Sequence, residues 1–561
     1  MWSSANSLVA LLSFPLCFAH IFFQIQIQKK KKKLAALVKR FRGSVASLLR
    51  HPTGAPVIDE LYSRASQRDR DAMTAELYSK EYSVFAPGAS GSGSGSGDST
   101  SSIPSSLSGA LEARGGDARA RREMLSRVAA LLTPLLEKAM VDPPIVHRVL
   151  AEYLECATDA AGREISSLLC GGATLLRVVH TRDGARAACR ALASAGAKER
   201  KAAVKAMKGH AAAMARDEWG HAVLSTVLTV VDDTALLSKA VVSELAGGGA
   251  AAAGEKEKEK DEPLLSELCS NPHASRVFCQ LLSPCDSKVL PPHTLALVKA
   301  ASDRALGEDG MGAGGEGGKN EEEENGDDDD GGEKASHDAA TASTAAAPSS
   351  SSFKPALTSK KSAAKRRREI LGSGSSASSL GSALLRVLAA DAGSLLRAPA
   401  GVDVVVEAAR GGGRDAILLP AHAEGVAKLH EAIVAAIEKS LNAKGGGGKK
   451  EKKEKKEQGE EEEEPEECLL THFYASRALR RLLLSGGDTT EAFSSLLWKR
   501  VLRGRCSELS KSHAAKVVAA VAATGGAETK KEIEGELREC VAGGDVTAWA
   551  AGVLKPPPAK K

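Results

Sequence analysis

Cationic side chains recur at one offset in the sequence, two residues after a small residue that opens an apolar, helix-like phrase. In "HTRDGARAACRAL" that small residue is Gly184, and its first, second and fifth followers are Ala185, Arg186 and Cys189. Residues three and four apart share one face of a helix, so these three side chains point the same way. The preceding Asp183 predicts the helix start, because its carboxylate accepts hydrogen bonds from the free amides of a first turn. A guanidinium on such a face can pair with phosphate or cover a nucleobase.

The same phrase occurs eight times, and this repetition predicts the architecture. The seven other small or apolar anchor residues that correspond to Gly184 are Gly54, Ile145, Gly220, Ala274, Gly401, Ala475 and Ala514. Compact neighbours are 36 to 39 residues apart, and a second amphipathic helix is predicted after each phrase, for example over 197–215 and 233–246. One helix pair cannot bury its apolar faces alone, so neighbours must stack. We therefore predict an all-α fold, an α-solenoid of stacked helical repeats with an extended concave surface, for which an L shape is one arrangement.

Composition supports helices and a polyanionic partner. Hydrophobic residues make up 43% of the 561 residues but aromatic residues only 3%, which favours helices packed through small aliphatic side chains over a β-sandwich. The formal net charge is +5, yet residues 308–333 contain twelve acidic side chains and one lysine, so the rest of the chain carries +16. A folded part this basic indicates a polyanion as partner, most often nucleic acid.

Low-complexity segments divide the chain, because their Gly, Ser, Lys and Glu content cannot form a core. We predict an apolar and polybasic head at 1–33, N-terminal repeats at 34–300 with inserts at 87–102 and 247–262, a disordered acidic insert at 301–365, C-terminal repeats at 366–554 with an insert at 443–467, and a basic tail at 555–561.

The head contains an apolar segment at 7–27 that is close to the length needed to cross a bilayer, with lysines on its C-terminal side. One interpretation is a membrane anchor with a cytosolic remainder. The other is a misassigned start or unspliced sequence. We expect no membrane segment after residue 33.

No residue pattern predicts catalysis, a cofactor or a metal. The ten cysteines include no Cys-x-x-Cys pair, which indicates a reducing compartment and no disulfide framework. The spacing of Cys269, His273, Cys279 and Cys285 fits no standard zinc pattern. We also find no phosphate-binding glycine loop of the GxxxxGK[ST] kind, and therefore expect a protein that is not an enzyme.

The repeats resemble those of the Pumilio family, and the more similar branch is the Puf-A or Penguin type. The resemblance rests on "LLRHPTGAPVIDELY", "EKAMVDPPIVHRVLAEYL", "KRRREIL" and above all "HTRDGAR…KERK…MKGH…VDDT…L" within 180–236. It runs from about 34 to 542, and the part after about 366 resembles the CPL region of that branch. The family normally begins with a long basic soluble segment, so for the head at 1–33 we favour the misassigned start over the membrane anchor.

In sequence-specific Pumilio proteins, the first and fifth residues of each triplet contact a base edge and the second stacks between bases. None of the eight triplets here has Gln or Glu at the fifth position, so we expect no base code. Cations at the second position instead indicate phosphate binding with little base preference. The predicted RNA-binding residues are Arg182, Arg186, Arg190, Lys198, Arg200, Lys201, Lys205, Lys208, Trp219, His221, Arg276, Arg477, Arg480 and Lys516.

The resemblance implies an RNA-binding protein of the nucleus and nucleolus that acts in large-subunit ribosome biogenesis through pre-rRNA processing, with translational regulation of mRNA as a further role. The implied partners are structured RNA, DNA, and pre-60S assembly factors or ribosomal proteins. A second hypothesis is a protein-binding scaffold of armadillo or HEAT type without direct RNA contact. Peptide grooves of such scaffolds usually carry ladders of Asn and Trp, whereas Arg and Lys occupy the corresponding position here.

Overall fold

The computed structural model describes most of the predicted repeats. The described residues are 34–79, 104–113, 117–157, 160–247, 258–306, 359–372, 379–445, 467–538, 541 and 544–555. The predicted head at 1–33, the insert at 87–102 and the central parts of the other inserts lie outside these ranges, as does the tail after residue 555. Within these ranges the secondary structure is helical, without a β-strand.

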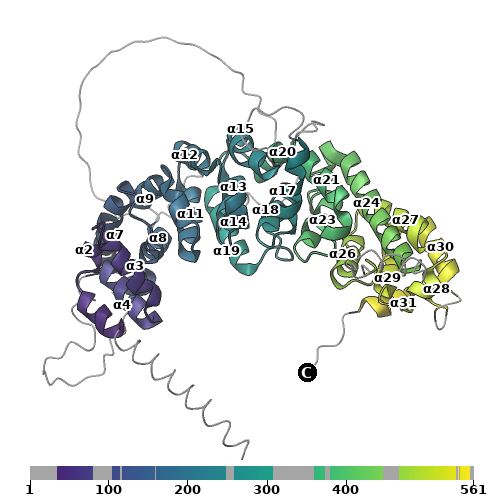
Figure 1. Cartoon of the computed structure of the whole chain (residues 1–561), viewed down its shortest axis with the longest axis horizontal. Coiled ribbons are helices and arrows are strands. Elements are labelled where there is room, and N and C mark those ends of the chain that lie inside the picture. The colour runs from purple at the N-terminus through teal and green to yellow at the C-terminus, as the bar shows by residue number, and fades with distance from the viewer. Residues whose placement is uncertain are drawn as a thin grey trace, which may run out of the picture.

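The helices stack in chain order into a curved arch (Figure 1). The N-terminal arm contains α2 (Val45–Leu49), α3 (Ala55–Arg64), α4 (Gln67–Tyr78), α6 (Leu107–Glu112), α7 (Ala118–Glu137), α8 (Pro144–Cys156) and α9 (Ala160–Cys170). The middle contains α10 (Thr174–Val178), α11 (Arg182–Ser194), α12 (Ala197–Met207), α13 (Ala211–Arg216), α14 (Gly220–Val230), α15 (Thr234–Leu237), η1 (Ser238–Val242), α16 (Ser243–Leu245), α17 (Lys258–Ser270), α18 (Ala274–Leu282), α19 (Pro292–Leu306) and α20 (Ala363–Leu371). The C-terminal arm contains α21 (Leu380–Ala390), α22 (Ala392–Leu395), α23 (Gly401–Ala409), α24 (Leu419–Gly445), α26 (Phe473–Leu483), α27 (Asp488–Leu497), η4 (Trp498–Leu502), α28 (Cys506–Leu509), α29 (Ala515–Thr524), α30 (Ala527–Leu537) and α31 (Val546–Leu554). The predicted all-α solenoid is confirmed.

Two anchor residues, Gly184 and Gly401, are buried where a short helix turns into the long helix of the repeat, α10 into α11 and α22 into α23. At Gly184 an added Cβ would lie 1.8 Å from the carbonyl oxygen of Val178, and at Gly401 it would lie 2.7 Å from that of Leu395. In both cases the carbonyl belongs to the residue six positions earlier, at the end of the short helix. These two anchors are therefore glycines because the backbone of the preceding helix passes too close for a side chain.

The helix that carries Arg186 begins two residues before the glycine. Thr181 is its N-cap, and the Thr181 hydroxyl accepts a hydrogen bond from the amide of Gly184 at 3.0 Å. Asp183 instead accepts from Arg186 at 2.9 Å. The prediction that Asp183 caps this helix is wrong, because a threonine one residue outside the first turn supplies the cap.

The predicted helix at 197–215 is two helices, α12 and α13. The break falls at Gly209, whose φ of +83° is in the left-handed region that favours glycine. The predicted helix at 233–246 is continuous and consists of α15, a π-helical turn η1 and α16. Three helices per repeat, two long and one short, therefore replace the predicted pair in the middle of the arch.

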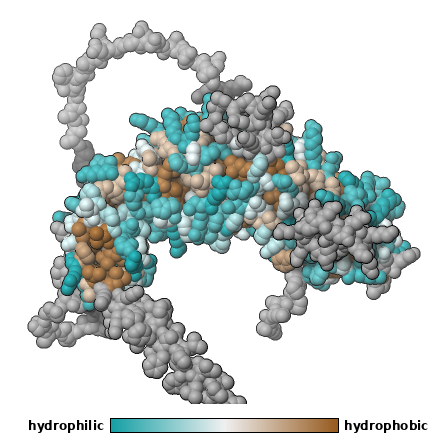
Figure 2. Space-filling view, in the orientation of Figure 1, coloured by the Kyte–Doolittle hydropathy of each residue, from teal (hydrophilic) through white to brown (hydrophobic). Residues whose placement is uncertain are grey.

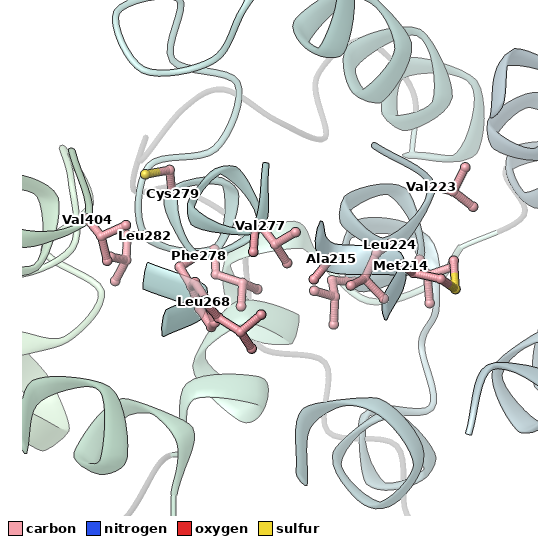
Figure 3. Close-up of a cluster of buried hydrophobic side chains, with 14 of the residues drawn as sticks. Met214, Ala215, Val223, Leu224, Leu268, Val277, Phe278, Cys279, Leu282 and Val404 are labelled. Carbon is pink, nitrogen blue, oxygen red and sulfur yellow. The ribbon is translucent and has the colours of Figure 1, made fainter. Parts of the chain in front are cut away.

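The hydrophobic core runs from repeat to repeat instead of forming separate centres. Figure 3 shows buried side chains from α13, α14, α17, α18 and α23 packed in one continuous cluster. The residues labelled there are Met214, Ala215, Val223, Leu224, Leu268, Val277, Phe278, Cys279, Leu282 and Val404. Because the apolar side chains of each repeat pack against both neighbouring repeats, no single repeat has a complete core.

Two helices outside the regular pattern lie on the inner side of the arch. Helix α19 packs against α11 and α14, and α31 packs against α29 (Figure 1). Helix α19 is the next described helix after the fifth phrase in the chain, but it does not take the outer position of a second helix. Helix α20 takes that place, because it packs on α15 at the outer side of the arch, as α12 does.

Candidate nucleic-acid interface

The positions that would contact base edges are buried in five consecutive repeats. Both the first and the fifth triplet residues are at most 8% exposed in these repeats. The residue pairs are Val146 and Leu150, Ala185 and Cys189, His221 and Ser225, Ser275 and Cys279, and Val402 and Val406. A buried side chain cannot form paired hydrogen bonds with a base edge, so these repeats lack a base code by burial as well as by residue type.

Helix α19 covers the triplets of α11 and α14. Its Thr294 hydroxyl lies 3.0 Å from Nε2 of His221, and its His293 ring lies 5.6 Å from the Trp219 ring, edge to face. Burial lowers the pKa of His221 to about 4 and keeps this imidazole neutral. His221 is fully buried, so its prediction as an RNA contact is wrong. Trp219 is half-buried and already has a ring partner from the same chain.

Arg200, a second predicted RNA contact, is only 2% exposed, and its guanidinium binds other groups of the protein. It donates hydrogen bonds to the carbonyl oxygens of Leu192 at 2.7 Å and Ala193 at 3.0 Å, both at the end of α11, and of Val230 at 3.0 Å. Burial lowers the pKa of Arg200 to about 10, still far above neutral pH. Its prediction as an RNA-binding residue is wrong, because its guanidinium satisfies the last carbonyls of two helices.

Arg186 and Arg190 are held by an acidic neighbour. Both form ion pairs with Glu155 of α8, Arg190 at 3.3 Å, and Arg186 also pairs with Asp183. Each side chain is about one-third exposed. Arg182, by contrast, is exposed and lines a hollow of about 350 Å³ between α3, α4, α8 and α11.

Between α19 and α31 the described ranges contain no further helix on the inner side of the arch (Figure 1), and we call this part the open section. Here Arg276 lines a hollow of about 380 Å³ between α18 and α23, together with Cys279 and Asp403. The guanidinium of Arg276 has a long contact of 3.4 Å to His273, and Asp403 accepts from Arg481 at 2.6 Å. Burial lowers the pKa of Arg276. This arginine is therefore partly desolvated, and among the described residues it forms no ion pair.

Three more predicted contacts continue this open section. Arg477 and Arg480 lie on α26, Lys516 lies on α29, and α18, α23, α26 and α29 pack against one another in that order. Arg477 and Lys516 are exposed and Arg480 is half-buried. Among the described residues none of the three has an ion-pair partner. We call the four cations of this open section the inner cationic row: Arg276, Arg477, Arg480 and Lys516.

The predicted lysines of α12 lie on the other side of the molecule. Lys198, Lys205 and Lys208 are exposed, and Lys201 pairs with Asp233 at 3.0 Å. Figure 1 shows α12 on the outer side of the arch, opposite α19. The structure therefore separates these lysines from the triplets, with which the sequence pattern grouped them. We call Lys198, Lys201, Lys205 and Lys208 the outer lysine ridge.

Two features of the surface were missed by the sequence reasoning. Lys365 and Arg368 of α20 are exposed on the same outer side, and the phrase "KRRREIL" could have indicated them. Phe473 and Tyr474 are exposed at the start of α26, and an aromatic pair in a chain with 3% aromatic residues was the available signal. The visible face is otherwise largely hydrophilic, with a broad apolar patch on the N-terminal arm and smaller apolar patches along the middle of the arch (Figure 2).

The described residues hold no cluster of three or more His, Cys, Asp or Glu side chains arranged for a metal ion. Cys269 and Cys279 are buried in α17 and α18, where burial raises the pKa of both thiols above the usual value. The helices of the described ranges also include none that is long and apolar enough to span a membrane. The segment at 7–27 lies outside these ranges, and the expectation that the chain is not an enzyme stays a prediction.

Comparison with known proteins places this geometry in a family. No protein-family model matches the chain. The chain is 31% identical to Pumilio homolog 24 of Arabidopsis thaliana over 513 residues, which are 91% of this chain and 70% of that relative. Its fold matches crystal structures of human Puf-A alone (TM-score 0.62, 17% identity) and in complex with DNA (TM-score 0.61, 18% identity), in both cases over 93% of this chain and 80% of the other. The identity and its coverage confirm the family predicted from the repeats: the chain belongs to the Pumilio-related proteins of the Puf-A or Penguin type.

Proposed function

We propose that this protein is a nucleic-acid-binding scaffold that grips the phosphate backbone with little preference for base sequence. One observation carries the proposal. The base-contacting positions of five repeats are buried, while the four residues of the inner cationic row are at least partly exposed and form no ion pairs among the described residues. A surface of this kind supplies affinity through charge and no hydrogen-bond pattern for discrimination.

The complex of human Puf-A with DNA supports a nucleic-acid ligand for this family. For the present chain we propose structured RNA as the main ligand, because the two basic surfaces lie on opposite sides of the arch. A folded RNA can contact the inner cationic row with one helix and the outer lysine ridge with another. DNA is then bound through the same phosphate contacts.

We further propose that the biological setting is large-subunit ribosome biogenesis in the nucleolus, through pre-rRNA processing, with translational regulation of mRNA as a second role. In this setting the protein holds precursor RNA in place while its acidic insert meets basic ribosomal or assembly proteins. The support is the family and the low base preference expected of the site. Crosslinking of the endogenous protein to RNA, followed by sequencing, tests the setting, and we expect precursor rRNA among the crosslinked species.

Filter binding across a range of salt concentrations tests the binding mode. A structured RNA and a scrambled RNA of equal length and helical content should bind with similar affinity, and both affinities should fall steeply with salt. An affinity that does not change with salt would overturn the proposal. So would one short sequence motif that binds more tightly than the scrambled RNA by orders of magnitude. Charge reversal at Arg276 and Arg477 should weaken crosslinking. If crosslinking is unchanged and protein partners are lost, the helical protein-binding scaffold is the correct hypothesis.

A further inference from the structure

Phe473 and Tyr474 form an exposed aromatic pair at the start of α26. Their side chains are 67% and 40% exposed, and their rings lie 5.1 Å apart, edge to face. The other exposed large hydrophobic residues in the described ranges are the aliphatic Leu37, Val57 and Leu484. An exposed aromatic pair gains nothing from core packing, so its position needs another explanation.

The pair lies in the open section of the inner side, next to two cations of the inner cationic row. Arg477 follows Tyr474 by three residues and therefore lies on the same helix face, and Arg480 follows one turn later. Arg477 is exposed and Arg480 is half-buried. Planar rings thus stand beside cations that have no acidic partner among the described residues.

A second repeat shows what the ring at this position contacts when a helix covers it. Trp219 immediately precedes its anchor Gly220, as Tyr474 precedes Ala475. The Trp219 ring contacts the His293 ring, which α19 brings to the inner side. Among the described helices, none equivalent to α19 packs on α26, and the ring contacts of Tyr474 within the described residues are with its own neighbours His472 and Phe473. The position before the anchor thus carries an aromatic ring in two repeats: the Trp219 ring contacts another planar ring, and the Tyr474 ring is exposed.

We propose that Phe473 and Tyr474 form a stacking site for unpaired nucleobases, and that Arg477 binds the phosphate beside the stacked base. The proposal rests on the proposed function and makes it more specific. Flanking cations favour a polyanion over an apolar peptide, and among polyanions single-stranded nucleic acid offers planar rings that stack on aromatic side chains without sequence preference. The site would select unpaired segments of a folded RNA by structure, while the remaining contacts stay on phosphates.

Binding measurements with the full chain test the proposal through two probes of equal charge. One probe is a single-stranded oligouridylate of about 12 nucleotides, and the other is an abasic oligomer of the same length. The double substitution Phe473→Ala and Tyr474→Ala should weaken oligouridylate binding by about tenfold or more, because base-aromatic stacking is lost. Binding of the abasic oligomer should not change, and neither should the salt dependence of either probe.

The matched variants separate stacking from charge and from misfolding. Arg477→Gln should weaken both probes alike and reduce the salt slope by about 0.7. Leu484→Ala, an equally exposed apolar change just beyond the end of α26, should leave both affinities unchanged. Tyr474→Trp should keep oligouridylate affinity, because the larger ring still stacks. Both aromatic side chains are exposed, so the double variant should unfold at the wild-type temperature.

Two outcomes would overturn the stacking site while leaving the proposed function in place. The first is a double variant that binds oligouridylate as tightly as the wild type, which itself binds in a salt-dependent way. The second is a double variant that loses self-association in sedimentation while oligouridylate binding is unchanged, because the pair would then contact a second copy of the chain. If the wild type binds neither probe, nor a structured RNA, the proposed function itself fails.

Discussion

Three arginines occupy the fourth residue of their helices and serve the same structural purpose. Arg70 of α4 donates hydrogen bonds to the carbonyl oxygens of Tyr62 and Ser63 at the end of α3. Arg200 of α12 donates to those of Leu192 and Ala193 at the end of α11. Arg366 of α20 donates to that of Thr229 at the end of α14. The free carbonyls at a helix C-terminus favour a cation, so a long helix ends against a guanidinium from a neighbouring helix. An arginine near a basic cluster is thus not by itself evidence for nucleic acid.

Replacing Arg200 distinguishes a role in stability from a role in RNA binding. Arg200→Met should lower the free energy of unfolding by at least about 2 kcal/mol, because the buried carbonyls of Leu192, Ala193 and Val230 lose their donor. RNA affinity of the folded variant should stay at the wild-type level. Lys205→Met on the exposed side of the same helix is the control, with little change in stability. Urea unfolding and filter binding check this, and a stable Arg200→Met variant with weakened RNA binding would contradict the structural role.

Two buried histidines predict the response to acid. Burial lowers the pKa of His147 and of His221 to about 4, against about 6.5 in the unfolded chain. Above pH 6.5 both states leave these rings neutral, so stability is unaffected. As the pH falls from 6.5 toward 4, the unfolded state binds protons at these rings and the folded state does not. This lowers the free energy of unfolding by about 2 kcal/mol per histidine at pH 5. Urea midpoints should drop accordingly. His221→Asn should flatten this dependence, whereas the exposed His210→Asn should not.

Individual residue roles could be predicted from the sequence only where their surroundings did not matter. The anchors and the second-position cations Arg477 and Lys516 were found from spacing alone, since spacing decides which helix face a residue occupies. The burial of Arg200 and His221 depends on which helix packs over them. A single sequence pattern holds no information on that contact, so those two assignments failed.

At the scale of helices, the repeats could be predicted from the sequence, but the packing of α19 over α11 and α14 could not. The 36-to-39-residue spacing depends on local periodicity, which a sequence displays directly. Helix α19 has an ordinary amphipathic sequence, and its position on the inner side follows from contacts with α11 and α14, which lie far away in the chain. The arrangement of α19 and α20 is therefore tertiary in origin.

A charge placed under α19 tests whether it protects the triplets beneath it. Val298 is fully buried, so Val298→Asp should detach α19 and increase amide hydrogen exchange in α11 and α14 as well as in α19 itself. Ala300→Asp, on the exposed side of the same helix, should leave exchange unchanged. If Val298→Asp raises exchange in α19 alone, the repeats beneath do not depend on their cover.

For the whole molecule, the separation of basic surfaces predicts additive contributions to binding. Removing three charges from the inner cationic row (Arg276→Gln, Arg477→Gln and Lys516→Gln) should reduce the salt slope for a structured RNA by about 2 to 3. Removing three from the outer lysine ridge (Lys198→Gln, Lys205→Gln and Lys208→Gln) should do the same.

The two sets lie on opposite sides of the arch, so their free-energy effects should add. Titrations of both triple variants and of the sextuple variant at several salt concentrations check this. If the sextuple variant is no weaker than one triple variant, RNA contacts only one side of the arch.

The cover formed by α19 also limits how this scaffold can be redesigned. Pumilio repeats invite the engineering of new base specificities by exchange of triplet residues. In α11 and α14 such exchanges would bury Asn, Gln or Glu side chains beneath α19, where they would cost folding energy and meet no base. The triplet of α26 (Ser476, Arg477 and Arg480) is at least partly exposed at every position, so any programmable recognition in this protein has to begin there.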